Sequence, residues 1–319
     1  MQTAYQLPFI TINNKYTNMK VKDGIIGLVV GDALGVPVEF SGKYERDKDP
    51  VTGMREYGTY NQPKGTWSDD SSMTIATMTS IINKNKIDYE DIMNEFINWC
   101  RYDKYTNSAS GRFDIGNATR KALINYHNGK SALESGGMGE RDNGNGSLMR
   151  ILPLAYIKSI DYNTIENVSS LTHAHKISKI ACVLYIEIAK SMVENDLEIH
   201  EHIELACDKI KDYYKDSSAL KNFEKILSND LDNVHGKTFV VQSLECVIHC
   251  LLTTNNYKDA VLKAVNFGDD TDTTAAICGG LAGIYYGYDS IPTDWINSVN
   301  KINEVESLCE KYESFCDNS

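Results

Sequence analysis

The stretch NFGDDTDTTAAICGGLAGIYYG, residues 266–287, decides the fold because it places three aspartates directly before a run of small and apolar residues. Asp269, Asp270 and Asp272 fall close together, and unit charges about 4 Å apart repel by roughly 1 kcal/mol even in water. The run that follows has the composition of a buried helix. Solvent together with a helix N-terminus, or a bound cation, must therefore stabilise these carboxylates.

A second stretch of the same design occurs about 200 residues earlier, at GTWSDDSSMT, residues 65–74. Here Ser68 precedes Asp69 and Asp70 at the start of an apolar helical pattern. Capping and the helix dipole explain one such element. Two elements, each with more carboxylates than a cap requires, make capping alone a less favoured explanation. If the two helix starts face each other, their oxygen-only donor set suits Mg²⁺, Mn²⁺ or Ca²⁺ rather than zinc.

Helical periodicity extends over most of the chain, and two-residue alternation is scarce. The expected helices are residues 22–40, 68–84, 89–102, 116–127, 147–160, 175–194, 199–214, 237–253, 257–267 and 272–287. No long Pro-, Gly- or Ser-rich linker interrupts them. The pattern predicts an all-α fold with one compact domain at residues 19–319, preceded by a loose arm at residues 1–18.

The overall charge restricts the classes of partner. The chain has 319 residues, a formal net charge of −12 and a sequence pI near 5.1. Without a Lys/Arg cluster, this acidity argues against nucleic acid or an anionic membrane as a partner. The first ten residues lack a basic flank before a long apolar run, and no apolar stretch reaches the roughly 18 residues of a membrane span. We expect a cytoplasmic protein.

Eight dispersed cysteines form no CxxC pair, which favours reduced thiols. Cys246 and Cys250, with His249 between them, raise the possibility of a zinc site. Their i, i+4 spacing within an apolar run is more typical of a helix face packed in a core.

Three further segments could contact a substrate near a metal site, although each also has an ordinary structural explanation. The Gly- and Asn-rich segment 142–150 can offer free backbone N–H groups to phosphate before a helix that begins near Ser147, or be an ordinary turn. Asp114 and Asn117 lie at a helix start and can serve as caps. His173 and His175 lie in a loop, where a histidine is more often structural than a ligand contact.

Six motifs together resemble the ADP-ribosylglycohydrolase family, most closely its dinitrogenase reductase-activating glycohydrolase type. In chain order they are GLVVGDALGVPVEF (27–40), GTWSDDSSMT (65–74), FDIGNATR (113–120), NGNGSLMRILPLA (143–155), SLTHAH (170–175) and the opening stretch. One motif alone is modest support, but all six occur in the family's order. The resemblance implies an all-α fold with two Mg²⁺ or Mn²⁺ ions that cleaves the glycosidic bond between ADP-ribose and a modified side chain.

The resemblance also implies a role for each matching residue. The implied metal ligands are Ser68, Asp69, Asp70, Asp270, Asp272 and Thr273. Ser68 stands where the family commonly has threonine, and its hydroxyl can still coordinate. The implied catalytic carboxylates are Glu39, Asp69 and Asp114. The implied substrate contacts are Asn117 at the ribose, Asn145, Gly146, Ser147 and Met149 at the pyrophosphate, and His173 at the distal part of the nucleotide.

The implied reaction passes through an oxocarbenium-like state that nearby carboxylates stabilise, with Asp114 as acid or base. The expected substrate is an ADP-ribosylated protein and the expected product is ADP-ribose. The FDIGN match favours an arginine linkage, while serine-linked and small-molecule substrates stay open. A non-catalytic ADP-ribose-binding relative and a helical Mg²⁺-dependent phosphohydrolase are the other hypotheses; the two intact acidic elements argue against the former. We expect a monomer without a nucleic-acid or membrane partner.

Overall fold

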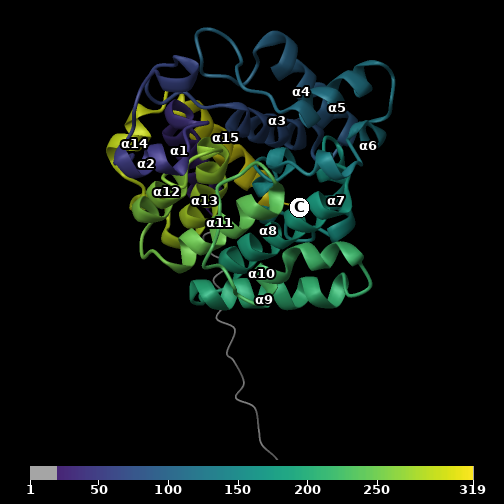
Figure 1. Cartoon of the computed structure of the whole chain (residues 1–319). Coiled ribbons are helices and arrows are strands. Elements are labelled where there is room, and N and C mark those ends of the chain that lie inside the picture. The colour runs from purple at the N-terminus through teal and green to yellow at the C-terminus, as the bar shows by residue number, and fades with distance from the viewer. Residues whose placement is uncertain (1–19, 319) are drawn as a thin grey trace, which may run out of the picture.

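The computed structural model describes residues 20–318, so the predicted arm at residues 1–18 lies outside the described residues. The helices in this range are α1 (Val21–Gly35), α2 (Lys43–Lys48), α3 (Asp69–Lys84), α4 (Tyr89–Tyr102), α5 (Asn117–His127), α6 (Ala132–Ser135), α7 (Tyr162–Ser170), α8 (Lys176–Glu194), α9 (Ile199–Tyr213), α10 (Glu224–Leu227), α11 (Val240–Leu252), α12 (Tyr257–Val265), α13 (Thr271–Tyr286), α14 (Thr293–Ser298) and α15 (Ile302–Asp317). In Figure 1, α9 lies at one end of the molecule, and α4 and α5 lie near the other.

Short 3₁₀ helices connect several of these elements: η1 (Val36–Val38), η2 (Gly58–Tyr60), η3 (Glu140–Asp142), η4 (Asn145–Ser147), η5 (Leu152–Tyr156), η6 (Ser218–Phe223) and η7 (Tyr288–Ser290). Between residues 20 and 318, β pairing is limited to three isolated bridges. The predicted all-α fold is therefore confirmed. Within the same range, none of the helices has the length and apolar character of a membrane span.

Residues 147–160 differ from the α-helix predicted for them. The segment instead contains the end of η4, a turn and η5, and the next α-helix begins only at Tyr162. Pro153 explains the difference, because it has no N–H to donate and its ring clashes with the carbonyl four residues earlier. The phosphate-binding helix start expected near Ser147 is consequently replaced by a 3₁₀ turn.

The closest packing in the core joins α1 to α13, which lie next to each other in the left-hand part of Figure 1. A Cβ atom at Gly31 would lie 2.2 Å from the carbonyl oxygen of Ala275, and one at Gly35 would lie 2.4 Å from the Cα atom of Asp272. Only glycine permits such a close approach of two backbones. The glycines of α1 thus bring the polar residues of this helix next to the start of α13.

The two acidic helix starts adopt the local structure that the sequence predicts. Ser68 is the N-cap of α3, where its hydroxyl accepts a hydrogen bond from the Asp70 N–H at 3.3 Å. Asp270 occupies the N-cap of α13, but its side chain makes no capping hydrogen bond. The Asp270 carboxylate is therefore available for other contacts.

All eight cysteines are free, as predicted, and Cys246 and Cys250 are fully buried on the apolar face of α11. No candidate metal-binding group in residues 20–318 includes either thiol. Their environment is that of packed core side chains.

Candidate active site

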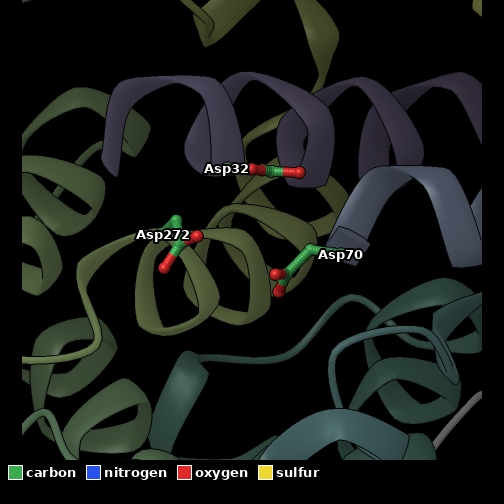
Figure 2. Close-up of side chains that lie close together, drawn as sticks. All are labelled: Asp32, Asp70 and Asp272. Carbon is green, nitrogen blue, oxygen red and sulfur yellow. The ribbon is translucent and has the colours of Figure 1, made fainter. Parts of the chain in front are cut away.

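Three aspartates from distant parts of the chain converge where α1, α3 and α13 meet. Figure 2 shows Asp32 pointing from α1, Asp70 from the first turn of α3 and Asp272 from the first turn of α13. One carboxylate oxygen from each lies within 4.8 Å of the others. Glu39, Asp270 and Asp272 form a second group within the same limit. Because the two groups share Asp272, they are adjacent parts of one acidic centre.

Hydroxyl and backbone groups hold the inner oxygens of this acidic centre. The hydroxyls of Ser68 and Thr273 donate hydrogen bonds to Asp70 Oδ2 at 3.0 and 3.2 Å. The Thr273 N–H donates to Asp272 Oδ1 at 2.9 Å. The hydrogen bond between Thr273 and Asp70 joins the starts of α13 and α3, so the two helix starts face each other, which is the condition for a shared oxygen-only donor set.

The remaining oxygens identify the kind of group that the acidic centre can hold. Asp70 Oδ1, Asp272 Oδ2 and Glu39 Oε2 are buried and have no hydrogen-bond partner among residues 20–318. Burial, followed by the charge of Asp32, raises the pKa of Asp70; burial, followed by the charge of Glu39, raises the pKa of Asp272. Because unpaired buried carboxylates are costly, these oxygens fit divalent cations that prefer oxygen ligands.

Asp32 belongs to this centre but was not among the residues selected from the sequence. It is fully buried and accepts hydrogen bonds from the backbone N–H groups of Ser68 and Ser71, at 2.9 and 3.0 Å. Burial raises its pKa to about 6, against the opposing effect of these hydrogen bonds. The signal in the sequence is a carboxylate deep inside a run of apolar residues and glycines, where no local role such as capping explains it.

A cavity of about 390 Å³ opens beside the acidic centre. Four carboxylate residues line it and form what we call the acidic lining: Glu39, Asp69, Asp114 and Asp270. Another part, the neutral lining, consists of Asn145, Gly146, Met149 and His173. Asn117 and Thr273 also line the cavity. Ser68, Asp70 and Asp272 lie behind this surface, so the structure brings together all predicted site residues except the Ser147 side chain.

Ser147 is fully buried, and its hydroxyl accepts a hydrogen bond from Ser169 at 3.0 Å. Its side chain does not line the cavity. The structure therefore does not place Ser147 in the cavity lining, where its predicted substrate contact would require it.

Glu39 and Asp114 occupy unusual surroundings within the acidic lining. Burial and then the charges of Asp114 and Asp270 raise the pKa of Glu39 to about 9. Burial and then the charge of Asp270 raise the pKa of Asp114 to about 6. The side chain of Tyr60, which was not a predicted site residue, acts on both carboxylates and opposes these rises in pKa. Asp114 also has a φ of 50°, a strained value that directs its side chain just before α5.

The neutral lining is anchored to the acidic lining through one amide. Asn145 Nδ2 donates hydrogen bonds to Asp270 Oδ2 at 2.7 Å and to Ser243 Oγ at 3.0 Å. Gly146 follows it and lies against the imidazole of His173, so that a Cβ atom there would be 2.8 Å from His173 Cε1. Both side-chain bonds of Asn145 hold the turn in place against α11 and α13.

Arg141 is the only cationic residue in the lining of this cavity as the described residues define it. It is exposed, and it forms no ion pair or hydrogen bond within residues 20–318. An unpaired guanidinium beside a row of carboxylates suits a ligand that carries negative charge itself.

Comparison with known proteins identifies the family that this geometry belongs to. Residues 14–318 match the sequence model of the ADP-ribosylglycohydrolase family. The chain belongs to the ADP-ribosylglycohydrolase family. This membership supports a hydrolase that acts on ADP-ribose linkages, and the metal dependence of the family agrees with the buried acidic centre.

Similar proteins include two bacterial hydrolases and a mammalian one. The ADP-ribosylarginine hydrolase Tri1 of Pseudomonas putida (strain GB-1) is 28% identical over 92% of this chain and 77% of its own length. The ADP-ribosyl-[dinitrogen reductase] glycohydrolase of Rhodospirillum rubrum is also 28% identical, over 88% of this chain and 90% of its own. The mouse ADP-ribosylhydrolase ARH3 is 23% identical over 76% of each chain.

The fold agrees with a solved structure of an ADP-ribosylglycohydrolase-related protein complex. The TM-score is 0.80 at 24% identity, and the match covers 93% of this chain and 98% of that chain. This likeness shows that the helical arrangement described above is that of the ADP-ribosylglycohydrolase fold.

Proposed function

We propose that this protein is a metal-dependent hydrolase that removes mono-ADP-ribose from modified arginine side chains of proteins. The observation that carries the proposal is the acidic centre with unpartnered oxygens beside a cavity whose neutral lining offers hydrogen-bond donors. The two bacterial relatives at 28% identity, one an ADP-ribosylarginine hydrolase by name, support the arginine linkage. We further propose a monomeric cytoplasmic enzyme with a single domain at residues 19–319.

The donor set divides into two neighbouring groups that suit two Mg²⁺ or Mn²⁺ ions. Asp32, Asp70 and Asp272 would hold one ion, and Glu39, Asp270 and Asp272 the other, with the hydroxyls of Ser68 and Thr273 close by. When bound, such ions polarise the ribose hydroxyls and lower the pKa of a coordinated water.

The chain's own residues position the sugar and move protons. We propose that Asp114 and Asn117 contact the ribose, and that Asp69 stabilises positive charge on the sugar ring as the bond to guanidine breaks. Water supplies OH to the anomeric carbon, and its other proton ends on the departing guanidine nitrogen. The Asp114 carboxyl, with a pKa raised to about 6, can accept and release a proton near neutral pH.

The proposal is tested with the full chain and an arginine-ADP-ribosylated protein, with free ADP-ribose followed by mass spectrometry in the presence of Mg²⁺ or Mn²⁺. The wild type should release ADP-ribose and lose this activity with a chelator. Loss of a residue that hydrogen bonds to a metal ligand typically lowers activity by roughly 10–100-fold. Because Asp272 is itself a proposed ligand, Asp272→Asn should reduce the rate by more than this. Asp269→Asn is the matched control: it lies three residues away, is half-buried and belongs to neither carboxylate group.

Parallel substrates decide between linkages and reaction types. Release of ADP-ribose from a serine-ADP-ribosylated protein, but not from an arginine-ADP-ribosylated one, would contradict the proposed arginine linkage. Release of inorganic phosphate from a nucleotide, without free ADP-ribose, would indicate a phosphohydrolase. Binding of ADP-ribose without any hydrolysis would indicate a non-catalytic relative.

A further inference from the structure

Behind the neutral lining lies a buried cation that the proposed reaction does not use. Arg150 is fully buried, and its guanidinium lies 4.7 Å from the ring centroid of Phe96. It forms no ion pair with any carboxylate in residues 20–318. Its Nη2 atom donates to the carbonyl oxygen of Val168 at 3.1 Å and to the hydroxyl of Thr172 at 2.9 Å. Within the described residues, the only side chain to which Arg150 donates is thus the Thr172 hydroxyl, next in the chain to His173.

The hydrogen bonds of Thr172 determine the direction of its O–H bond. A guanidinium only donates, so Thr172 Oγ1 is the acceptor toward Arg150. The same oxygen lies 2.8 Å from His173 Nδ1. No other acceptor within the described residues hydrogen bonds to this hydroxyl. The hydroxyl therefore donates its proton to Nδ1, and the neutral imidazole must carry its own proton on Nε2.

The opposite edge of the imidazole is directed at the turn that lines the cavity. A Cβ atom at Gly146 would lie 3.3 Å from His173 Nε2, and one at Gly144 would lie 3.6 Å from it. Both glycines and His173 line the cavity. Nε2 makes no hydrogen bond to any group in residues 20–318, so its N–H is available to a ligand.

We propose that Arg150 and Thr172 are positioning residues that fix His173 in the Nε2–H tautomer, so that it donates a hydrogen bond to an acceptor atom of the ligand in the cavity. The identification of that acceptor as an atom of the nucleotide part of ADP-ribose rests on the proposed function. The tautomer itself follows from contacts within this chain.

The charge states of the groups that face His173 agree with this arrangement. Burial, then the charge of Arg150, lowers the pKa of His173 to about 3, while Asp142 acts weakly in the opposite direction. Burial lowers the pKa of Arg150 to about 10, so it remains a cation at neutral pH. His173 is consequently a neutral donor across the physiological range.

The tautomer can be measured directly by ¹⁵N NMR of the full chain labelled at histidine, with His173→Gln used to assign the ring signals. The wild type should show a protonated Nε2 and an unprotonated Nδ1. Thr172→Val, which removes the hydroxyl at nearly constant volume, should shift His173 toward a mixture of tautomers. Thr172→Ser retains a hydroxyl and should restore the wild-type signals.

Binding of ADP-ribose, measured by calorimetry on the same proteins, connects the tautomer to the ligand. Thr172→Val should weaken binding about tenfold, the loss expected for one hydrogen bond. Thr172→Ser should recover it. A protonated Nδ1 in the wild type, or an unchanged tautomer in a folded Thr172→Val variant, would overturn the proposal. Should Thr172→Val fail to fold, the wild-type spectrum and Thr172→Ser still decide it.

The two proposals can fail separately. If the wild type shows the Nε2–H tautomer but does not bind ADP-ribose, the positioning role stands and the proposed function is rejected. If the wild type hydrolyses ADP-ribosylarginine but carries its proton on Nδ1, the proposed function stands and the positioning role is rejected.

Discussion

The acidic centre and the neutral lining meet at the hydrogen bond from Asn145 to Asp270, yet they differ in how their polar atoms are satisfied. In the acidic centre, buried oxygens of Asp70 and Asp272 have no partner within the described residues. In the neutral lining, His173 Nδ1 has its partner in Thr172, and only Nε2 is left for a ligand. The first region holds buried oxygens that suit a cation, whereas the second is preorganised by protein groups alone.

The largest effect should come from weakening the acidic centre through Asp32→Asn. The asparagine offers one acceptor oxygen where Asp32 uses its carboxylate for Ser68 and Ser71, and it removes one charge from the group shared with Asp70 and Asp272. We expect affinity for Mn²⁺, measured by calorimetry, to fall by about 10–100-fold.

Asp23→Asn provides the matched control on the same helix. Asp23 lies in the first turn of α1, where Oδ1 accepts a hydrogen bond from the Tyr288 N–H at 3.0 Å, an acceptor that asparagine retains. The affinity of the Asp23→Asn variant for Mn²⁺ should equal that of the wild type. Equal affinity for Asp32→Asn, with the fold verified by circular dichroism, would remove Asp32 from the metal centre.

An intermediate effect should appear in the neutral lining as a pH dependence of stability. Folding lowers the pKa of His173 from 6.5 to about 3, so the unfolded chain binds a proton there that the folded protein does not. His173 therefore makes the free energy of unfolding fall as the pH drops from about 6.5 toward 3. When the pH is lowered from 7.5 to 4.5, the free energy of unfolding of His173→Gln should therefore fall by less than that of the wild type. The difference should be up to about 2 to 3 kcal/mol.

Urea denaturation at the two pH values measures this difference. His200→Gln is the control, because His200 is exposed on α9, and its curve should stay parallel to that of the wild type. If His173→Gln also stays parallel to the wild type, the imidazole is not held neutral by its burial.

Local patterns explain why the acidic helix starts could be predicted from the sequence. Ser68 caps α3 and Asp270 precedes α13 because capping involves residues that are neighbours in the chain. That these helix starts face each other was only a condition at the level of the sequence, and the Thr273–Asp70 hydrogen bond fulfils it. The roles of the individual residues in binding and catalysis stay predictions.

Contacts between distant segments explain what the sequence did not show. The partners of Asp32, Ser68 and Ser71, lie 36 and 39 residues away, so nothing near Asp32 in the sequence reveals its role. The helix expected at residues 147–160 failed for a local reason, since Pro153 outweighs the apolar periodicity around it. The Arg150–Thr172–His173 contacts likewise depend on how the turn after η4 packs against the end of α7.

The smallest effect should come from Arg141→Gln, which sharpens the comparison by testing the one cation that residues 20–318 contribute to the cavity lining. Arg141 is exposed, and it has no partner within residues 20–318 that would hold its side chain in one position. A solvated charge contributes at most about 1 kcal/mol to binding an anion, so Arg141→Gln should bind ADP-ribose about 2- to 5-fold more weakly than the wild type.

Calorimetry at low salt measures this loss of affinity. Lys130→Gln is the control, because Lys130 is an exposed charge outside the lining, and it should leave the affinity for ADP-ribose unchanged. Near 1 M salt, where the screening length is only about 3 Å, the difference should disappear. A loss that persists at high salt would instead place Arg141 in a desolvated, directional contact, and the donor groups of the cavity would then include a charge as well as the neutral imidazole of His173.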